Sequence, residues 1–188
     1  SLELLSEVVG SLPAGLMLTG PSGLSEAVAK VRPTRPEGSH AKYELRDRSA
    51  VTPVDERVVA LGSGDADRVA ALYGTDPGAA FFLPSMLDDD SFVGVAGPDG
   101  GLLAAAGTHV LSDRQRIAAL GSVFVHPAHR GQRLGEIVTA GVIERIRDRI
   151  DVIGLNVAES NEAARRIYDR LGFAVVHTYE EATLLPPR

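Results

Sequence analysis

The sequence has no cysteine, no long apolar run and no excess of basic charge, and each absence excludes a class of protein. Without cysteine, disulfides, thiolate zinc sites and cysteine nucleophiles are excluded. The net charge of −6 argues against nucleic acid or a membrane surface as the main partner, because both attract basic proteins. No apolar stretch approaches the roughly 20 residues of a membrane span. The chain also opens without the basic start of a secretory leader, so we expect a cytoplasmic protein.

The 188 residues are 44% apolar, which is enough to bury a sizeable core. The first 52 residues differ in pattern from the rest, so we expect an accessory segment at 1–52, without chemistry of its own, and a main domain at 53–188. In the first segment, apolar residues at helical spacing mark a helix. Its members are Leu2, Leu5, Val8 and Val9. After this helix the expected elements are a buried strand at 15–20, a helix at 24–31, a Pro-rich loop at 32–39 and a half-exposed strand at 40–46.

From residue 53 the pattern is that of an α/β domain with a mixed, largely antiparallel sheet and one strand–helix–strand crossover. A Pro-Asp-Gly-Gly turn joins two apolar runs and predicts a hairpin at 91–111. The other expected strands are 56–62, 116–125, 152–157 and 173–179, and the expected helices are 63–74, 134–150 and 161–171.

The loop Arg130-Gly131-Gln132-Arg133-Leu134-Gly135 opens a helix directly after a strand. Amide N–H groups at such a start lack intrahelical partners, and the helix dipole adds positive potential. The arrangement predicts a phosphate cradle. It is neither a P-loop nor a dinucleotide fingerprint, since the glycine spacing and the Lys-Ser/Thr pair of those motifs are missing. The alternative is a tight turn with solvated arginines.

A second motif follows that loop. Asn161, Ala164, Tyr168 and Leu171 recur along one helical face, and Gly172-Phe173 restarts the sheet. The two motifs, in this order, resemble the GNAT superfamily of N-acetyltransferases over residues 53–179. The wording "ALGSVFVHPAHRGQRLG" is most similar to the branch related to glycine N-acyltransferases.

The resemblance implies the GNAT fold, a mixed, mostly antiparallel sheet flanked by helices, with a splayed strand pair that binds acyl-CoA. It implies acetyl-CoA as cosubstrate. The pantetheine arm would bind the backbone of Val123, Phe124 and Val125. The pyrophosphate would bind at Arg130, Gly131, Gln132, Arg133, Leu134 and Gly135. Many members have glycine at the position of Arg133, and we expect Arg133 to lie in the first helical turn with ordinary dihedral angles, where a side chain costs little.

The resemblance also assigns roles to two residues of the second motif. Asn161 matches a position that hydrogen-bonds the cofactor, although asparagine there also suits a helix N-cap. Tyr168 matches the general acid that protonates the departing CoA thiolate, a plausible donor because phenols have a pKa near 10. The alternative for Tyr168 is a core aromatic residue.

The general base is not evident. Many relatives carry a glutamate on the central strands, but residues 118–123 contain no acid, and the neighbouring strand offers only Asn156. Ser122 could hold a water molecule. His109 is the best titratable candidate, with an ordinary strand-end histidine as its alternative. Weaker options are Glu159, Glu180 and Glu181.

Three other features carry structural interpretations. His126 and His129 lie in a Pro-containing loop with no third ligand, so we expect no metal site. The acidic run Asp88, Asp89 and Asp90 could attract a cationic amine or be a solvated turn. The alternating charges of residues 145–151 indicate an exposed helix face.

We therefore expect an acyl-CoA-dependent N-acyltransferase that moves an acetyl group directly to a small-molecule or peptide amine. The alternatives are an inactive GNAT-fold CoA sensor, an acyl-CoA enzyme that transfers to oxygen or water, and a nucleotide-binding protein unrelated to CoA. The sequence does not identify the amine, and a homodimer stays open.

Overall fold

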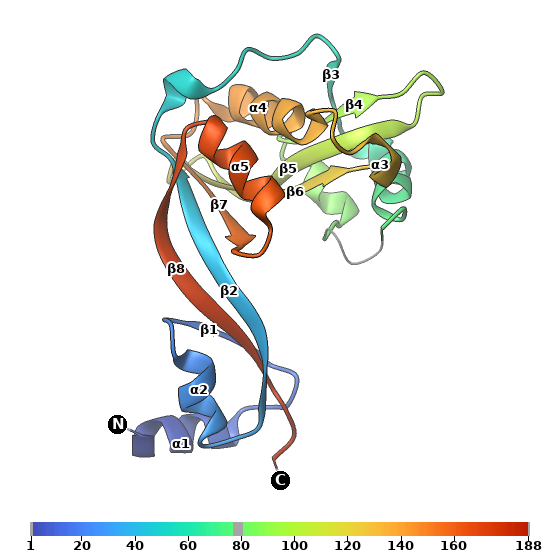
Figure 1. Cartoon of the computed structure of the whole chain (residues 1–188). Helices are drawn as coiled ribbons and strands as arrows, with labels where there is room; N and C mark the ends of the chain where they lie inside the picture. The colour runs from blue at the N-terminus through green and yellow to red at the C-terminus, as the bar shows by residue number, and fades with distance from the viewer. Residues whose placement is uncertain (1, 77–80, 188) are drawn as a thin grey trace. The chain divides into compact units, whose positions relative to one another are not determined.

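The computed structural model describes residues 2–76 and 81–187, which form two compact units (Figure 1). The larger unit combines Tyr43–Asn156 with Ala163–Ala174. The smaller unit combines the segment up to Lys42 with Val157–Glu162 and with the segment from Val175 onward. Because both units take segments from distant parts of the chain, the division of the sequence at residue 52 stays a prediction.

The helices and strands follow the order expected from the pattern. The helices are α1 (Leu2–Ser11), α2 (Leu24–Ala29), α3 (Ala66–Tyr73), α4 (Leu134–Ile146) and α5 (Glu162–Arg170). The strands are β1 (Met17–Gly20), β2 (Thr34–Leu45), β3 (Val58–Ala60), β4 (Val93–Ala96), β5 (Leu102–Ser112), β6 (Ile117–Val125), β7 (Val152–Ala158) and β8 (Phe173–Leu184). Short 3₁₀ turns lie at Arg48–Ala50, Ser63–Asp65, Pro84–Leu87 and Pro127–His129.

The sheet of the larger unit runs in the order β8-β2-β7-β6-β5-β4-β3. Its β3–β4, β4–β5 and β5–β6 pairs are antiparallel, whereas β6 and β7, joined through α4, are parallel. The expectation of a mixed, largely antiparallel sheet with one crossover is confirmed.

Helices cover both faces of this sheet. Phe92, which is fully buried, packs in one cluster with Val69 and Leu72 of α3. The next residue, Val93, lies against Gly141 of α4. Because successive strand residues point to opposite faces, α3 and α4 lie on opposite sides of the strands, as Figure 1 shows.

The smaller unit has a core of its own. Val9 of α1, Val28 of α2 and Leu184 of β8 are buried together, and β1 pairs with β8. The guanidinium of Arg32 is buried in this unit because backbone carbonyls accept its hydrogen bonds, those of Val9, Leu12 and Leu185. The side chains of Leu2 and Leu5 lie outside the described residues, and Val8 is exposed.

Two expectations for the N-terminal segment are wrong. The expected loop at 32–39 is the first half of β2, and the expected buried strand at 15–20 is the exposed strand β1. Proline lacks the N–H that a strand ladder uses, so the sequence predicts a loop, but the structure includes Pro36 in β2. Strands tolerate a proline where the missing N–H would face no partner strand.

Three element ends also differ from the sequence pattern. The helix expected at 24–31 ends at Ala29, the long helix ends at Ile146 rather than 150, and the last strand continues to Leu184. Ile150 is still fully buried, because a turn in which its N–H bonds the Ile146 carbonyl keeps it over the sheet. Apolar periodicity therefore marked a buried residue that lies beyond the helix.

We predict that Gly107→Ala destabilises the protein by about 1–3 kcal/mol, the usual cost of overpacking a core. A Cβ atom at position 107 would lie 2.2 Å from the ring of Phe92, which is fully buried and cannot move aside. Urea unfolding checks this value. Gly64→Ala is the control, because its Cβ would meet nothing within 4 Å, and equal stability of the two variants would contradict the prediction.

Candidate functional site

The candidate site begins where β6 separates from β7. In the larger unit their parallel ladder runs from Ile117–Val152 to Leu120–Leu155 and stops there. β6 continues to Val125 and stays paired with β5 on its other side. The backbone of Val123, Phe124 and Val125 therefore lies in the part of β6 beyond the ladder with β7, as a splayed strand pair requires.

A β-bulge lies at the point of separation. Gly107 pairs with Gly121 and Ala105 with Phe124, so β6 uses one residue more than β5 over this stretch. Ser122 takes up the extra length with a left-handed φ of 52°. Such a conformation is costly for a residue with a side chain and persists only where neighbours hold it.

Four contacts hold this bulge. Tyr73 Oη donates a hydrogen bond of 2.6 Å to the Ser122 carbonyl, and the Tyr73 ring packs edge-on against Phe124. Ser122 Oγ donates to the Phe81 carbonyl at 2.7 Å and lies 3.0 Å from His109 Nε2. Because Tyr73 is buried, water competes little for the hydrogen bond between its hydroxyl and the Ser122 carbonyl.

The first turn of α4 follows the end of β6. Six successive amide N–H groups there have no acceptor in the part of the chain that the structure describes. They belong to Gly131, Gln132, Arg133, Leu134, Gly135 and Glu136. Gly131 has a φ of +81°, which only glycine adopts at little cost. With the helix dipole, these groups can bind an anion.

The expectation for Arg133 is wrong. Arg133 is the N-cap of α4 rather than a residue of its first turn, and its φ of 61° is left-handed. This conformation explains why glycine suits the position, since a side chain there costs about 1 kcal/mol. The Arg133 carbonyl accepts the first helical hydrogen bond, from Ile137 N–H at 3.1 Å.

A buried carboxylate offsets that cost. Glu136 is 3% exposed, and its oxygens accept hydrogen bonds from Arg133 and from Arg170, the latter at 2.6 and 2.8 Å. Burial raises the pKa of Glu136, but the hydrogen bonds from the two guanidinium groups lower it by more, so it lies below its ordinary value. Glu136 therefore fixes Arg133 beside the cradle.

The second arginine of the loop also has an acidic partner. Arg130 Nη2 donates to Asp76 Oδ2 at 2.6 Å, and both side chains are partly exposed. The loop sequence contains no acid, yet the fold supplies one carboxylate to each of its two arginines. An anion at the cradle would compete with Asp76 for Arg130.

Gly135 lets the first turn of α4 pack closely against its neighbours. A Cβ atom there would lie 3.2 Å from Ile167 of α5 and 3.6 Å from Val125. The first turn of α4 thus approaches both α5 and the end of β6, which brings the cradle next to the splayed strand. Leu134, beside it, is buried.

Tyr168 lies on α5 and is 6% exposed. Its ring packs against Tyr43 and Phe173, with centroid distances of 6.1 and 5.9 Å. Burial raises the pKa of Tyr168 to about 12, and no described residue hydrogen-bonds its hydroxyl. The side chain is therefore both a core aromatic residue and a phenol that stays protonated at neutral pH.

The remaining candidates come from both units. Asn156 is exposed on β7, and Asn161 immediately precedes α5 and donates its N–H to the Ala158 carbonyl. Asn161 belongs to the smaller unit, so its contact with a cofactor stays a prediction. The Glu180 carboxylate accepts from the Gly23 and Ser25 amides, which lowers its pKa and gives it a structural role. In the same unit, Glu181 faces His40 at 3.8 Å and Glu159 donates its N–H to the Ser39 carbonyl.

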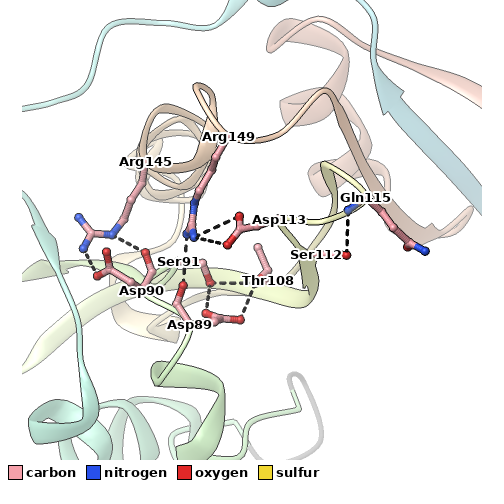
Figure 2. Close-up of polar contacts among 9 residues, drawn as sticks. All are labelled: Asp89, Asp90, Ser91, Thr108, Ser112, Asp113, Gln115, Arg145 and Arg149. Carbon is pink, nitrogen blue, oxygen red and sulfur yellow. Dashed lines mark hydrogen bonds and ion pairs between the residues drawn. The ribbon is translucent and has the colours of Figure 1, made fainter.

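Arg145 of α4 and Arg149, which follows the helix, hold Asp89 and Asp90 of the acidic run before β4, as Figure 2 shows. Asp89 accepts hydrogen bonds from Ser91 and Thr108, and Asp90 pairs with Arg145. The interpretation of residues 145–151 as a purely solvated face is wrong for Arg145 and for Arg149, which binds Asp113 and the Asp89 carbonyl. These contacts leave Asp89 and Asp90 poorly suited to attract an amine.

His126 and His129 line a surface hollow of about 500 Å³ beside the hairpin tip at residues 99–103. His126 Nδ1 accepts the Ala128 amide, and the two rings stack edge to face. Residues 2–76 and 81–187 contain no group of three side chains that could hold a metal ion, and no helix among them is long and apolar enough to cross a bilayer.

Residues 43–173 match the model of the acetyltransferase (GNAT) family. The chain belongs to the GNAT family of acetyltransferases. Its fold is the GNAT fold, and a GNAT-family protein from Novosphingobium aromaticivorans superposes with a TM-score of 0.68 at 24% identity, over 98% of this chain and 80% of that one.

Two curated relatives are named mycothiol acetyltransferase. The one from Nocardiopsis dassonvillei is 33% identical over 108 residues, and the one from Salinispora tropica is 37% identical over 92 residues. These matches cover 54% and 46% of this chain. They span only 32% and 30% of the relatives, so the chain corresponds to about a third of their length.

Sequence reasoning missed Glu136, Asp76 and Tyr73. Glu136 carried a signal, because it stands on the helical face otherwise formed by buried residues and has Arg133 three positions before it. Asp76 and Tyr73 carried none, since their partners Arg130 and Ser122 are 54 and 49 positions away.

We predict that Glu136→Gln destabilises the protein by about 1–3 kcal/mol at pH 7, because bonds to a charged acceptor are lost. The pKa of Glu136 is lowered by folding from 4.5, so its contribution is present above pH 4.5 and is lost as the pH falls through the folded value. Urea unfolding at pH 7 and at pH 3.5 should show a difference from wild type that shrinks at low pH. Glu144→Gln, an exposed pair of Arg147, is the control, and a pH-independent difference for Glu136→Gln would contradict the prediction.

Proposed function

We propose that this protein transfers an acetyl group from acetyl-CoA directly to the nitrogen of an amine. One observation carries the proposal: six amides at the start of α4, to which no described residue supplies an acceptor, lie next to the end of a strand whose ladder with its neighbour has stopped. The first feature suits a pyrophosphate, and the second suits an extended chain of amides such as pantetheine. Membership of the GNAT family supports reading the two together as an acyl-CoA site.

In this proposal the backbone of Val123, Phe124 and Val125 binds pantetheine as a missing strand would. The pyrophosphate is bound by the amides of Gly131, Gln132, Arg133, Leu134 and Gly135. Arg130 adds charge once the anion draws it from Asp76, and Arg133 adds charge from the position beside the cradle where Glu136 holds it. Asn161 adds a cofactor hydrogen bond.

Tyr168 is proposed as the general acid. With a pKa raised to about 12, its phenol stays protonated over the whole working range and can donate to the developing CoA thiolate. The absence of any described hydrogen-bond partner for its hydroxyl supports this role, because a donor without a partner is available for a ligand.

The acceptor remains open. The curated relatives are named for mycothiol rather than glycine, so the resemblance to glycine N-acyltransferases stays a prediction. The expectations of a homodimer and of no nucleic-acid partner are likewise untested.

The first experiment is calorimetric titration with acetyl-CoA, followed by detection of free thiol with a panel of amines. Binding with amine-dependent thiol release supports the transferase. Binding without release on any amine favours a CoA sensor, and release without amine favours hydrolysis. Absence of binding refutes the acyl-CoA site.

Tyr168→Phe should lower kcat/KM about 100-fold or more while acetyl-CoA affinity changes less than twofold, because the phenol acts on the leaving thiolate and not on the resting cofactor. An assay of thiol release measures kcat/KM, and calorimetry measures the affinity for acetyl-CoA. The matched control is Tyr179→Phe on β8. Unchanged turnover in Tyr168→Phe would remove its role as acid.

Replacing both Arg130 and Arg133 with alanine should weaken acetyl-CoA about tenfold, which corresponds to 1.4 kcal/mol. Affinity for a pantetheine fragment without phosphates should stay the same, since the arginines are assigned only to the pyrophosphate. The double variant Arg57→Ala with Arg114→Ala removes the same charge elsewhere. An equal loss for both ligands would contradict the cradle.

A further inference from the structure

His109 stands at the point where the splayed strand begins. A Cβ atom on Gly121 would lie 2.5 Å from three atoms of the His109 ring, so the imidazole lies directly against the backbone of β6. Gly121 immediately follows Leu120, the last residue of β6 that pairs with β7. The ring is thus next to the gap in which the thioester would lie under the proposed function.

The face of the sheet on which His109 lies also suits a general base. Gly107 pairs with Gly121, and paired residues of antiparallel strands point to the same face, so the His109 ring over Gly121 lies on the face of Gly107, whose Cβ would meet Phe92 in the cluster under α3. The helices α4 and α5, which carry the cradle and Tyr168, touch through Gly135 and Ile167 on the other side. An acid and a base on opposite faces can act on one thioester in the gap without reaching each other.

The hydrogen bonds of Ser122 decide the tautomer of His109. A serine hydroxyl has a single proton, and a carbonyl can only accept. Ser122 Oγ therefore gives its proton to the Phe81 carbonyl at 2.7 Å and must accept from His109 Nε2 at 3.0 Å. Nε2 carries the imidazole proton, and the lone pair of a neutral ring is on Nδ1, which no described residue hydrogen-bonds.

The surroundings keep the ring neutral. Phe81, edge-on with a centroid distance of 6.4 Å, Gly121 and Ser122 lie against the ring, and none of the three is charged. Burial lowers the pKa of His109 below its ordinary value of 6.5. The side chain nevertheless remains exposed on one side, so a substrate can reach it.

We propose that His109 Nδ1 is the general base that deprotonates the acceptor amine, with Ser122 fixing its tautomer; this rests on the proposed function. Nδ1 takes one proton from the ammonium form and passes it to water. The nitrogen then attacks the thioester carbonyl, the C–N bond forms and the C–S bond breaks. Tyr168 protonates the sulfur and is restored by the second proton that the nitrogen loses.

The first test is nuclear magnetic resonance of the ring nitrogens of ¹⁵N-labelled protein, which needs no acceptor. The signals of His109 are identified by their loss in His109→Gln, since the chain has only five histidines. We expect a protonated Nε2, a bare Nδ1 and a titration midpoint below 6.5. Ser122→Ala should give a mixture of tautomers. A protonated Nδ1, or a charged ring at pH 7.5, would overturn the proposal.

The second test is the pH profile of kcat/KM on whichever amine of the panel releases thiol. In wild type the rate should rise with pH through the His109 midpoint, because only the neutral ring accepts a proton. His109→Gln should lose that inflection and at least 100-fold in rate. Gly121→Ala, which pushes the ring away without removing it, should lose at least tenfold, while the control His177→Gln on β8 should match wild type.

The outcomes separate this inference from the function on which it rests. If wild type releases thiol on no amine, the proposed function fails, and the base has no reaction to serve. If wild type turns over and His109→Gln keeps its rate and pH profile, the base assignment alone is refuted. Loss in His109→Gln but not in Gly121→Ala would refute the part of the inference that depends on the ring position.

Discussion

The candidate site depends on one strained residue. Ser122 holds a left-handed backbone in the middle of an otherwise regular strand, and the bulge it creates lies where β6 parts from β7. The Tyr73 hydroxyl fixes its carbonyl and the Phe81 carbonyl fixes its hydroxyl. The same hydroxyl accepts from His109. The opening of the sheet and the orientation of the imidazole therefore follow from one residue, and the strain is offset by contacts from α3 and from the segment after it.

A second constraint is the balance of charge around the cradle. An unoccupied anion site with two free arginines would carry uncompensated positive potential. Here each arginine has a carboxylate, Asp76 for Arg130 and Glu136 for Arg133. The two pairs differ in burial, since Asp76 is partly exposed and Glu136 is buried. An exposed pair is easily exchanged for a ligand, whereas the buried carboxylate, also held by Arg170, acts mainly to anchor the start of α4.

The GNAT motifs and the order of helices and strands along the larger unit could be predicted because they are local signals. Apolar periodicity marks α4 and β6, the Pro-Asp-Gly-Gly turn marks the hairpin, and glycine spacing marks the cradle. The predictions were wrong where a local sequence rule was overridden by contacts with residues distant in the chain. Proline predicts a break at residue 36, yet Pro36 lies inside β2, and Ile150 continues the apolar periodicity of α4 although the helix ends at Ile146. Arg145 and Arg149 were read as solvated because their partners before β4 and after β5 are distant in sequence.

The sequence by itself determined the class of fold, the family and the segment proposed to bind an anion, since each depends on residues within one turn or one strand of each other. Only the tertiary structure decided what the titratable groups do. That Glu136 is buried against Arg170 and that His109 has its lone pair on Nδ1 both follow from contacts between different elements of the fold. A hydrogen bond fixes a proton only when both partners are in place, and that placement is a property of the folded sheet rather than of the order of residues.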